Sequence, residues 1–211
     1  MSNRPNPSNA PGRVLAIAFA AAIVAVIIGV VIALSGGSDD VATTDTRPVF
    51  GEVTVEGSSL EAFASTDGDS AIGERAPVVS GSDSSGSAAS IGEAGEPTIV
   101  AFLAHWCPHC QAELPVLVDL MADGELEGIR MVAVLTGTSA ERPNYPPLAW
   151  LDREGWEGDT LLDDESSTAA QAYGLTSYPF LVFLDVDGTV VARTVGEIGG
   201  DAIVALADQA R

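Results

Sequence analysis

Apolar residues are most concentrated near the start of the chain, in an uncharged stretch from Val14 to Leu34. Because ~20 helical residues cross a hydrocarbon layer about 30 Å thick, this stretch predicts one transmembrane helix. A cleaved signal peptide has a shorter apolar region of ~7–15 residues that ends in an A-x-A-like site. The residues after Ile32 offer no good site of that kind. We therefore predict an uncleaved membrane anchor.

Charges on the two sides of the stretch predict its orientation. Arg4 and Arg13 precede it, whereas Asp39 and Asp40 follow it. Cytoplasmic flanks carry the excess of positive residues, so the N-terminus is predicted in the cytoplasm. The remainder of the chain is then an extracytoplasmic part of a single-pass cell-membrane protein.

Four regions follow from these patterns. A Pro-, Asn- and Ser-rich cytoplasmic tail is predicted at 1–13, the transmembrane helix at 14–34, a linker and N-terminal extension of the fold at 35–69, and a folded domain at 70–211. The alternating residues Val53 to Val55 indicate a short strand within the extension.

In residues 70–211 buried-strand patterns alternate with helical ones. Thr98–Leu103 and Ile129–Leu135 are continuous apolar runs typical of central strands. Between them, apolar residues at helical spacing predict a helix that ends near Gly124. Two β-rich runs around Asp187-Gly188 predict an antiparallel hairpin. The other predicted elements are a hairpin of 76–79 with 88–91, helices at 146–154, 166–173 (capped by Ser166 or Ser167) and 202–210 (capped by Asp201), and a strand at 160–162. This order predicts an α/β fold, a mixed sheet flanked by helices.

Charge excludes one class of partner. The chain has 30 acidic residues against 9 basic ones, all arginine, and a net charge of -21. Nucleic acid binding needs clustered positive charge, so it is not expected here. The acidic run at 163–165 is interpreted as a solvated turn, and Trp150 and Trp156 as packing residues.

The two cysteines and both histidines lie in one short stretch, His105 to Cys110, at a predicted strand–helix junction. A redox cysteine reacts as its thiolate, which is favoured at a helix N-terminus, where Cys107 would lie. Cys110, one turn later, could then resolve a mixed disulfide. Pro108 suits the first helical turn because it has no N–H to leave unsatisfied.

His109 would tune this pair. A partly cationic imidazole beside a thiolate stabilises the reduced form, which makes the disulfide a stronger oxidant. The dipeptide Pro108-His109 therefore favours an oxidising potential, although residues outside it also contribute.

Three other uses of the cysteines fit the sequence less well. A purely structural disulfide is possible, but so small a ring constrains the unfolded chain little. Zinc needs four ligands, and the cysteines and histidines here are too crowded in sequence for tetrahedral geometry. Haem attachment requires C-x-x-C-H, and position 111 is glutamine.

The segment from Phe102 to Pro115 resembles the active site of the thioredoxin superfamily. It is most similar to the membrane-anchored TlpA/ResA-like thiol-disulfide oxidoreductases, whose pattern is W-C-x-x-C-x-x-E-x-P. The matching residues are Trp106, Cys107, Cys110, Glu113 and Pro115. The dipeptide between the cysteines departs toward DsbA-like oxidases, so the direction of electron flow stays open.

The resemblance implies a thioredoxin-like fold over about 70–211 and roles for several residues. Cys107 would be the nucleophile and Cys110 the resolving cysteine, with no cofactor other than their disulfide. Glu113 would transfer protons to and from the buried cysteine, or be an ordinary helix carboxylate. Pro115 would kink the helix, and Trp106 would shield the Cys107 side of the site.

A second landmark is Tyr178-Pro179, before the predicted hairpin. The resemblance implies a cis peptide bond at Pro179, facing the disulfide, with Tyr178 in contact with the substrate backbone. His105 is more readily interpreted as a structural histidine than as a catalyst.

The expected activity is disulfide exchange with cysteine-containing extracytoplasmic proteins, with a membrane redox partner that recharges the site. The alternative is a thioredoxin-like binding or chaperone module with a structural disulfide. A peroxiredoxin-type peroxidase is disfavoured because Ala104 stands where such a site has threonine.

Overall fold

The computed structural model describes residues 45–211. The predicted cytoplasmic tail and transmembrane helix lie outside these residues, as do residues 35–44 of the predicted linker and N-terminal extension. Within 45–211, no helix has the length and apolar character required to cross a membrane. Asp45–Arg211 form one compact unit.

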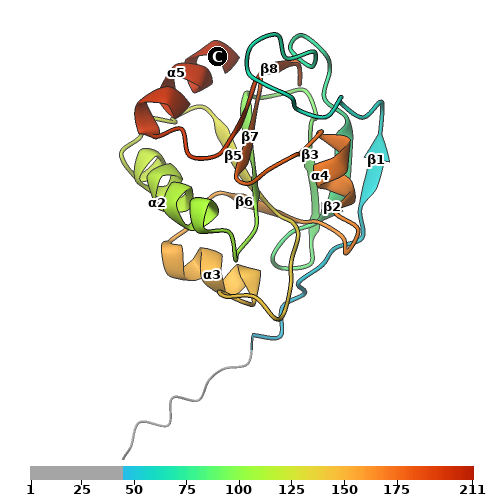
Figure 1. Ribbon diagram of the computed structural model, residues 1–211, viewed down its shortest axis with the longest axis vertical. Coiled ribbons are helices and arrows are strands. Elements are labelled where there is room, and N and C mark those ends of the chain that lie inside the picture. Colours follow the sequence, from blue (N-terminus) through green and yellow to red (C-terminus); the bar gives the residue numbers. More distant parts are fainter. Residues whose placement is uncertain (1–44) are drawn as a thin grey trace, which may run out of the picture. The chain divides into compact units, whose positions relative to one another are not determined.

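A single mixed sheet is the centre of this unit (Figure 1). Its eight strands are β1 (Thr54–Glu56), β2 (Val78–Ser82), β3 (Ala88–Ile91), β4 (Thr98–Leu103), β5 (Arg130–Leu135), β6 (Asp159–Leu162), β7 (Phe180–Leu184) and β8 (Val190–Val195). Their spatial order is β1-β2-β6-β5-β4-β7-β8, and β3 pairs with β2.

Strand directions follow from the connections. β4, β5 and β6 are parallel because helical crossovers join them, whereas β7 and β8 form an antiparallel hairpin beside β4. The predicted hairpin of β2 and β3 is also present. The predicted mixed sheet is therefore confirmed, and β4, which leads into the cysteines, is an interior strand between β5 and β7.

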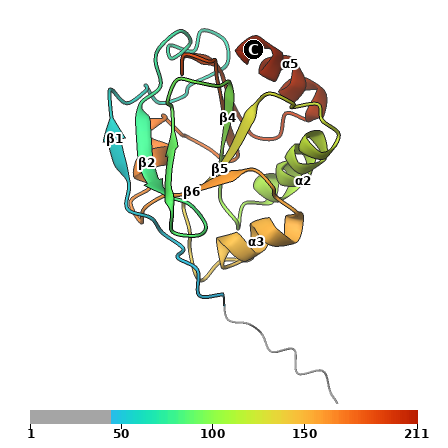
Figure 2. The same cartoon turned by 180° about the vertical axis from the view of Figure 1, so that it is seen from behind.

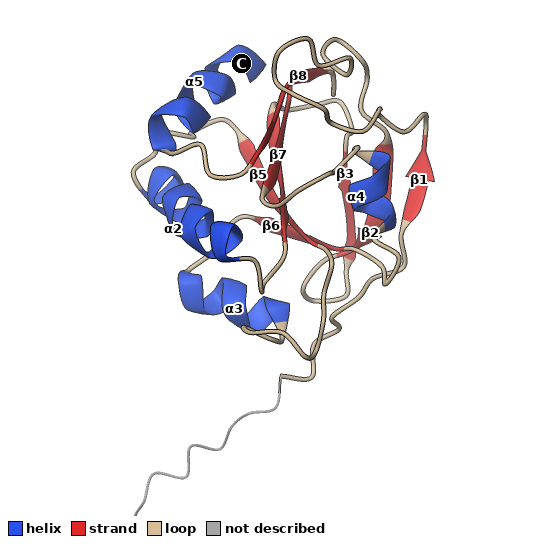
Figure 3. Cartoon of the chain, viewed as in Figure 1, coloured by secondary structure: helices blue, strands red, loops and turns tan. Residues whose placement is uncertain are grey.

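Helices cover both faces of the sheet (Figures 1 and 3). They are α2 (Pro108–Ala122), α3 (Pro147–Glu154), α4 (Thr168–Ala172) and α5 (Gly200–Ala210). The views from the front and from behind agree that α2, α3 and α5 lie on one face (Figure 2). The other face packs against α4 and the segment that contains Leu60 and Phe63.

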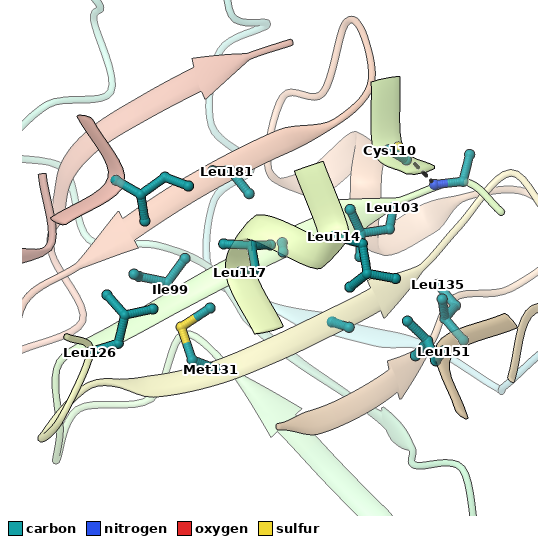
Figure 4. Close-up of a cluster of buried hydrophobic side chains, with 14 of the residues drawn as sticks. Ile99, Leu103, Cys110, Leu114, Leu117, Leu126, Met131, Leu135, Leu151 and Leu181 are labelled. Carbon is teal, nitrogen blue, oxygen red and sulfur yellow. Dashed lines mark hydrogen bonds between the residues drawn. The ribbon is translucent and has the colours of Figure 1, made fainter. Parts of the chain in front are cut away.

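The sheet is buried from both sides, which explains why its central strands are apolar throughout. All six residues of β4 are buried. Ile99, Ala101 and Leu103 face the cluster with α2, α3 and α5, shown in Figure 4. Val100 and Phe102 face the opposite cluster. Trp150 is fully buried and Trp156 half-buried in the first cluster, which confirms their predicted packing role.

The predicted N-terminal extension contributes to this core. β1 pairs with β2, and the side chains of Leu60 and Phe63 are buried. Asp69 accepts hydrogen bonds from the buried guanidinium of Arg193, at 2.9 Å from its Nε and also from Nη2. A segment far from β8 in sequence is thereby bonded directly to it.

The acidic run at 163–165 is not simply a solvated turn. Asp163 is 1% exposed, and its carboxylate accepts hydrogen bonds from the N–H groups of Ala169 and Ala170 at the start of α4. Asp164 accepts the N–H of Thr168. The prediction was wrong for Asp163 because the first N–H groups of a helix need acceptors, and these carboxylates supply them.

Ser167, one of the two predicted caps, is the N-cap residue of α4, but it has a φ of 57° and its side chain makes no capping bond. The predicted cap of α5 was wrong. Asp201 lies inside the first turn of α5, where Gly199 is the N-cap residue. An acid in the first turn still interacts favourably with the helix dipole.

Candidate active site

The cysteines lie at the junction of β4 and α2, as predicted. Cys107 is the N-cap residue of α2, and Pro108 is its first residue. Cys107 is 7% exposed, and its thiol lies 3.9 Å from the carbonyl oxygen of Tyr178. A thiol at this end of a helix lies where the dipole favours the thiolate.

Cys110 lies one turn deeper and has no exposed surface. Its Sγ accepts a hydrogen bond from the N–H of Ala104 at 3.4 Å, drawn in Figure 4. Burial raises the pKa of the Cys110 thiol above its ordinary range. Cys110 is therefore a neutral thiol that must lose its proton before it can attack a disulfide.

Glu113 is a buried carboxyl group one turn beyond Cys110 on the same helix. It is 1% exposed, and its Oε1 lies 3.4 Å from the N–H of Ile198. Burial raises the pKa of this carboxyl, and the nearby negative charge of Glu197 raises it further. Glu113 is thus not an ordinary exposed helix carboxylate, and its raised pKa favours a group that can both hold and release a proton.

Tyr178 and Pro179 border Cys107 from the sheet side. The peptide bond between them is cis, as expected from the resemblance. The rings of Tyr178 and Trp106 meet edge to face, with centroids 5.9 Å apart. Trp106 also donates its Nε1–H to the carbonyl oxygen of Gly137 at 2.8 Å. These contacts fix the side chains of Trp106 and Tyr178 against each other next to Cys107, where they form a wall of two aromatic rings.

His105 has a structural position. Its Nδ1 donates to the carbonyl oxygen of Pro143 at 2.6 Å, and its Nε2 accepts the N–H of Ser139 at 3.2 Å. This pair of contacts requires the neutral tautomer with the proton on Nδ1. Burial lowers the pKa of His105, which favours the same neutral form. The ring thereby connects the end of β4 to the loop between β5 and α3.

That loop reaches the site through Arg142. Its guanidinium carbon lies 4.7 Å from the ring centroid of Trp106, in the geometry of a cation–π contact. Asn144 donates to the carbonyl oxygen of His105 at 3.2 Å, so side chains and backbone together hold the loop.

His109 contacts a different segment, the one between β8 and α5. Its Nδ1 lies 2.5 Å from Oε1 of Glu197, and both side chains are substantially exposed, at 66% and 46%. The predicted tuning residue therefore has an acidic partner.

Comparison with known proteins identifies the family of this chain. Residues 72–193 match the AhpC/TSA family. The chain belongs to the AhpC/TSA family. This family is thioredoxin-like, so the predicted resemblance and the thioredoxin-like α/β fold are both confirmed.

Individual proteins are also similar to this chain. Methylamine utilization protein MauD of Methylobacillus flagellatus is 30% identical over 125 residues, 58% of this chain and 56% of that protein. Thiol-disulfide oxidoreductase ResA of Halalkalibacterium halodurans is 24% identical over 102 residues, 48% of this chain and 55% of that protein. The matches thus span little more than half the length of these relatives.

A solved structure shows the shared fold. The thiol:disulfide interchange protein of the thioredoxin family from Chlorobium tepidum aligns with a TM-score of 0.54 and 22% identity. The alignment covers 64% of this chain and 94% of that one.

In this AhpC/TSA family member, most predicted site residues do meet. Trp106, Cys107 and Tyr178 form the outer part of the site, and Cys110 and Glu113 lie beneath it in α2. No sequence pattern pointed to Arg142, Gly137 or Glu197. Their contacts join segments that are distant along the chain, and none of the three residues lies in a motif.

Proposed function

We propose that this protein is a thiol-disulfide oxidoreductase that exchanges disulfides with protein thiols through Cys107 and Cys110. The observation that carries the proposal is the asymmetry of the pair. Cys107 lies at a helix N-terminus with some exposure, and Cys110 is buried directly behind it. A nucleophile in front of a protected resolving thiol is the arrangement that two-step exchange requires.

In the reducing direction, the Cys107 thiolate attacks one sulfur of a substrate disulfide. A mixed disulfide forms, and the other substrate sulfur leaves as a thiolate. Cys110 then transfers its proton to Glu113 and attacks the sulfur of Cys107. The bond from Cys107 to the substrate breaks, the second substrate thiolate leaves, and two electrons have passed from the pair to the substrate. Oxidation of substrate thiols is the reverse sequence.

The residues around Cys107 have further roles in this proposal. The wall of Trp106 and Tyr178 excludes water from one side of Cys107, and the backbone before the cis-proline Pro179 lies where an extended substrate segment can approach. We assign substrate contact to Tyr178 on this basis, since its carbonyl oxygen is the group next to the Cys107 thiol.

We also propose that the exchange takes place outside the cytoplasm, on a domain tethered by residues 14–34. The length of that apolar stretch and the arginines before it support this topology. Its substrates are then cysteine-containing extracytoplasmic proteins, and a membrane redox partner returns the pair to its starting state. Such disulfide chemistry suits an oxidising compartment.

One experiment tests the proposed activity. The purified full chain in detergent is equilibrated with reduced and oxidised glutathione, and the fraction of the Cys107–Cys110 disulfide is measured after acid quenching and alkylation. We expect a reversible transition and catalysis of insulin reduction. A potential near about -120 mV favours an oxidase, and one near about -270 mV a reductase. A pair that does not equilibrate, in a protein that neither reduces nor oxidises a model substrate, supports the binding-module alternative instead.

Glu113→Gln should slow the exchange and stabilise the fold. Removal of a group that accepts the Cys110 proton should lower the rate of mixed-disulfide resolution by roughly 100-fold, in the range of general-base effects. Stopped-flow measurements of that step with wild type and variant test the expectation, and a rate unchanged by the substitution removes Glu113 from the mechanism.

The effect on stability has a defined sign. Because burial raises the pKa of folded Glu113, the folded state holds its proton more strongly than the unfolded state does. Wild-type stability therefore falls as the pH rises from about 4.5 through the folded pKa. Glutamine cannot ionise, so the variant should have a higher Tm than wild type at pH 7, and the difference should vanish near pH 4.

A further inference from the structure

A short glycine-bounded loop between β8 and α5, Gly196–Gly199, contacts the active site at separate points. The N–H of Gly196 donates to the carbonyl oxygen of Pro179 at 2.9 Å. The N–H of Ile198 lies 3.4 Å from Oε1 of Glu113. The loop is therefore held by the cis-proline on one side and by the buried carboxyl group on the other.

The residue between these two contacts is Glu197. With its neighbours fixed by their backbone N–H groups, its side chain extends to His109, where Oε1 lies 2.5 Å from Nδ1. His109 is in the first turn of α2, two residues after Cys107. A carboxylate from a different part of the chain is thus placed against the imidazole that belongs to the C-P-H-C sequence.

The charge of this pair differs from that of His109 alone. If the imidazole is protonated, the pair is neutral, and if it is not, the pair carries one negative charge. Histidine alone would carry one positive charge or none. In both protonation states Glu197 makes the neighbourhood of Cys107 one unit more negative, which disfavours a thiolate there.

We propose that Glu197 is a positioning residue that holds His109 and makes the Cys107–Cys110 pair a weaker oxidant than the C-P-H-C sequence alone indicates. This inference rests on the proposed exchange activity. A thiolate that is less stabilised makes the reduced form less favourable, and a less favourable reduced form means a lower reduction potential.

The expected size is modest because both side chains are exposed. Interactions between exposed charges are weakened by water and by salt. We expect Glu197→Gln to shift the equilibrium constant with glutathione by about 3–10-fold toward the dithiol, where tenfold corresponds to ~30 mV for a two-electron couple. High salt should move the wild-type potential toward that of the variant.

The test is a set of equilibrium constants measured on full-length variants against glutathione. Glu157→Gln is the matched control, since Glu157 is an exposed acid just before β6, at the opposite end of the parallel strands from the cysteines. A second pair of proteins carries His109→Gln with and without Glu197→Gln. The Glu197 carboxylate is held beside the start of α2 by its contact with His109. Without that partner the exposed side chain is free to move away, so its substitution should have less than half its original effect in the His109→Gln background.

The outcomes separate clearly. A shift confined to Glu197→Gln and reduced in the His109→Gln background supports the inference. A shift no larger than that of Glu157→Gln overturns it, as does a shift of equal size in both backgrounds. If the wild-type pair exchanges with glutathione but no shift is found, the proposed activity stands and only the role of Glu197 fails. A wild-type pair that does not exchange at all overturns the activity itself.

Discussion

Cys110→Ser should convert a brief intermediate into a stable covalent complex, whereas Cys107→Ser should abolish exchange. Without Cys110 the mixed disulfide on Cys107 can be released only by an external thiol. Well-placed intramolecular groups react as though present at very high concentration. We therefore expect release to slow by at least about 1,000-fold at millimolar external thiol.

The complex is measured as a heavier band on non-reducing gels after incubation with a disulfide-containing protein. Cys107→Ser should give no such band, because Cys110 has no exposed surface from which to attack a substrate. The double variant serves as the control for non-specific coupling. A complex formed through Cys110, in the Cys107→Ser protein, contradicts the roles assigned to the two thiols.

Arg193→Ala should cause a large loss of stability although the residue lies outside the site. The Arg193 side chain has no exposed surface and that of Asp69 is 3% exposed. The guanidinium also donates to the carbonyl oxygens of Glu61 and Tyr173, at 2.9 and 3.0 Å. Removal of the arginine leaves a buried carboxylate without its counter-charge, which costs about 3–5 kcal/mol.

Thermal unfolding followed by circular dichroism measures the loss, and a decrease in Tm of roughly 10 °C is expected for a domain of this size. Arg130→Ala is the matched control. Arg130 pairs with Asp159 at 2.7 Å, but Asp159 is 58% exposed, so its loss should cost at most ~1 kcal/mol. Equal effects of the two substitutions contradict the assigned role of the buried pair.

The same pair makes a pH-dependent contribution. The hydrogen bonds from Arg193 hold the pKa of Asp69 below its ordinary value. The folded state therefore binds the Asp69 proton less strongly than the unfolded state does. The stabilisation is complete above the unfolded pKa of about 3.9 and is lost as the pH falls through the folded pKa. Arg193→Ala should lack this part of the acid sensitivity.

Sequence patterns predicted the helices and strands whose periodicity can be recognised within a short stretch of the chain. The apolar run of β4 and the helical spacing after Cys110 placed both elements correctly, because a strand buried on two faces and a helix with one buried face leave distinct periodicities. The cysteine pair was found because its motif is short and continuous, and the cis bond at Pro179 was expected because the family resemblance implied it.

Long-range contacts were not predictable in this way. His109 and Glu197 are 88 positions apart, and no periodicity connects them. Asp163 was interpreted as part of a solvated turn because its neighbours are acidic. It is buried because its carboxylate accepts the N–H groups at the start of α4, a contact that depends on how the chain folds back. Pairwise contacts between irregular segments leave no periodic signal in one sequence.

The loop anchored by His105 has an evolutionary consequence. His105 holds main-chain atoms of Pro143 and Ser139, and these contacts place no demand on the side chains at 140–142. The exposed Arg142 beside Trp106 can therefore be exchanged for other residues without loss of the loop's course. Surface loops on a rigid scaffold are where binding preferences diverge most readily. Related proteins can thus acquire new partner preferences at this rim while the thiol chemistry beneath it stays the same.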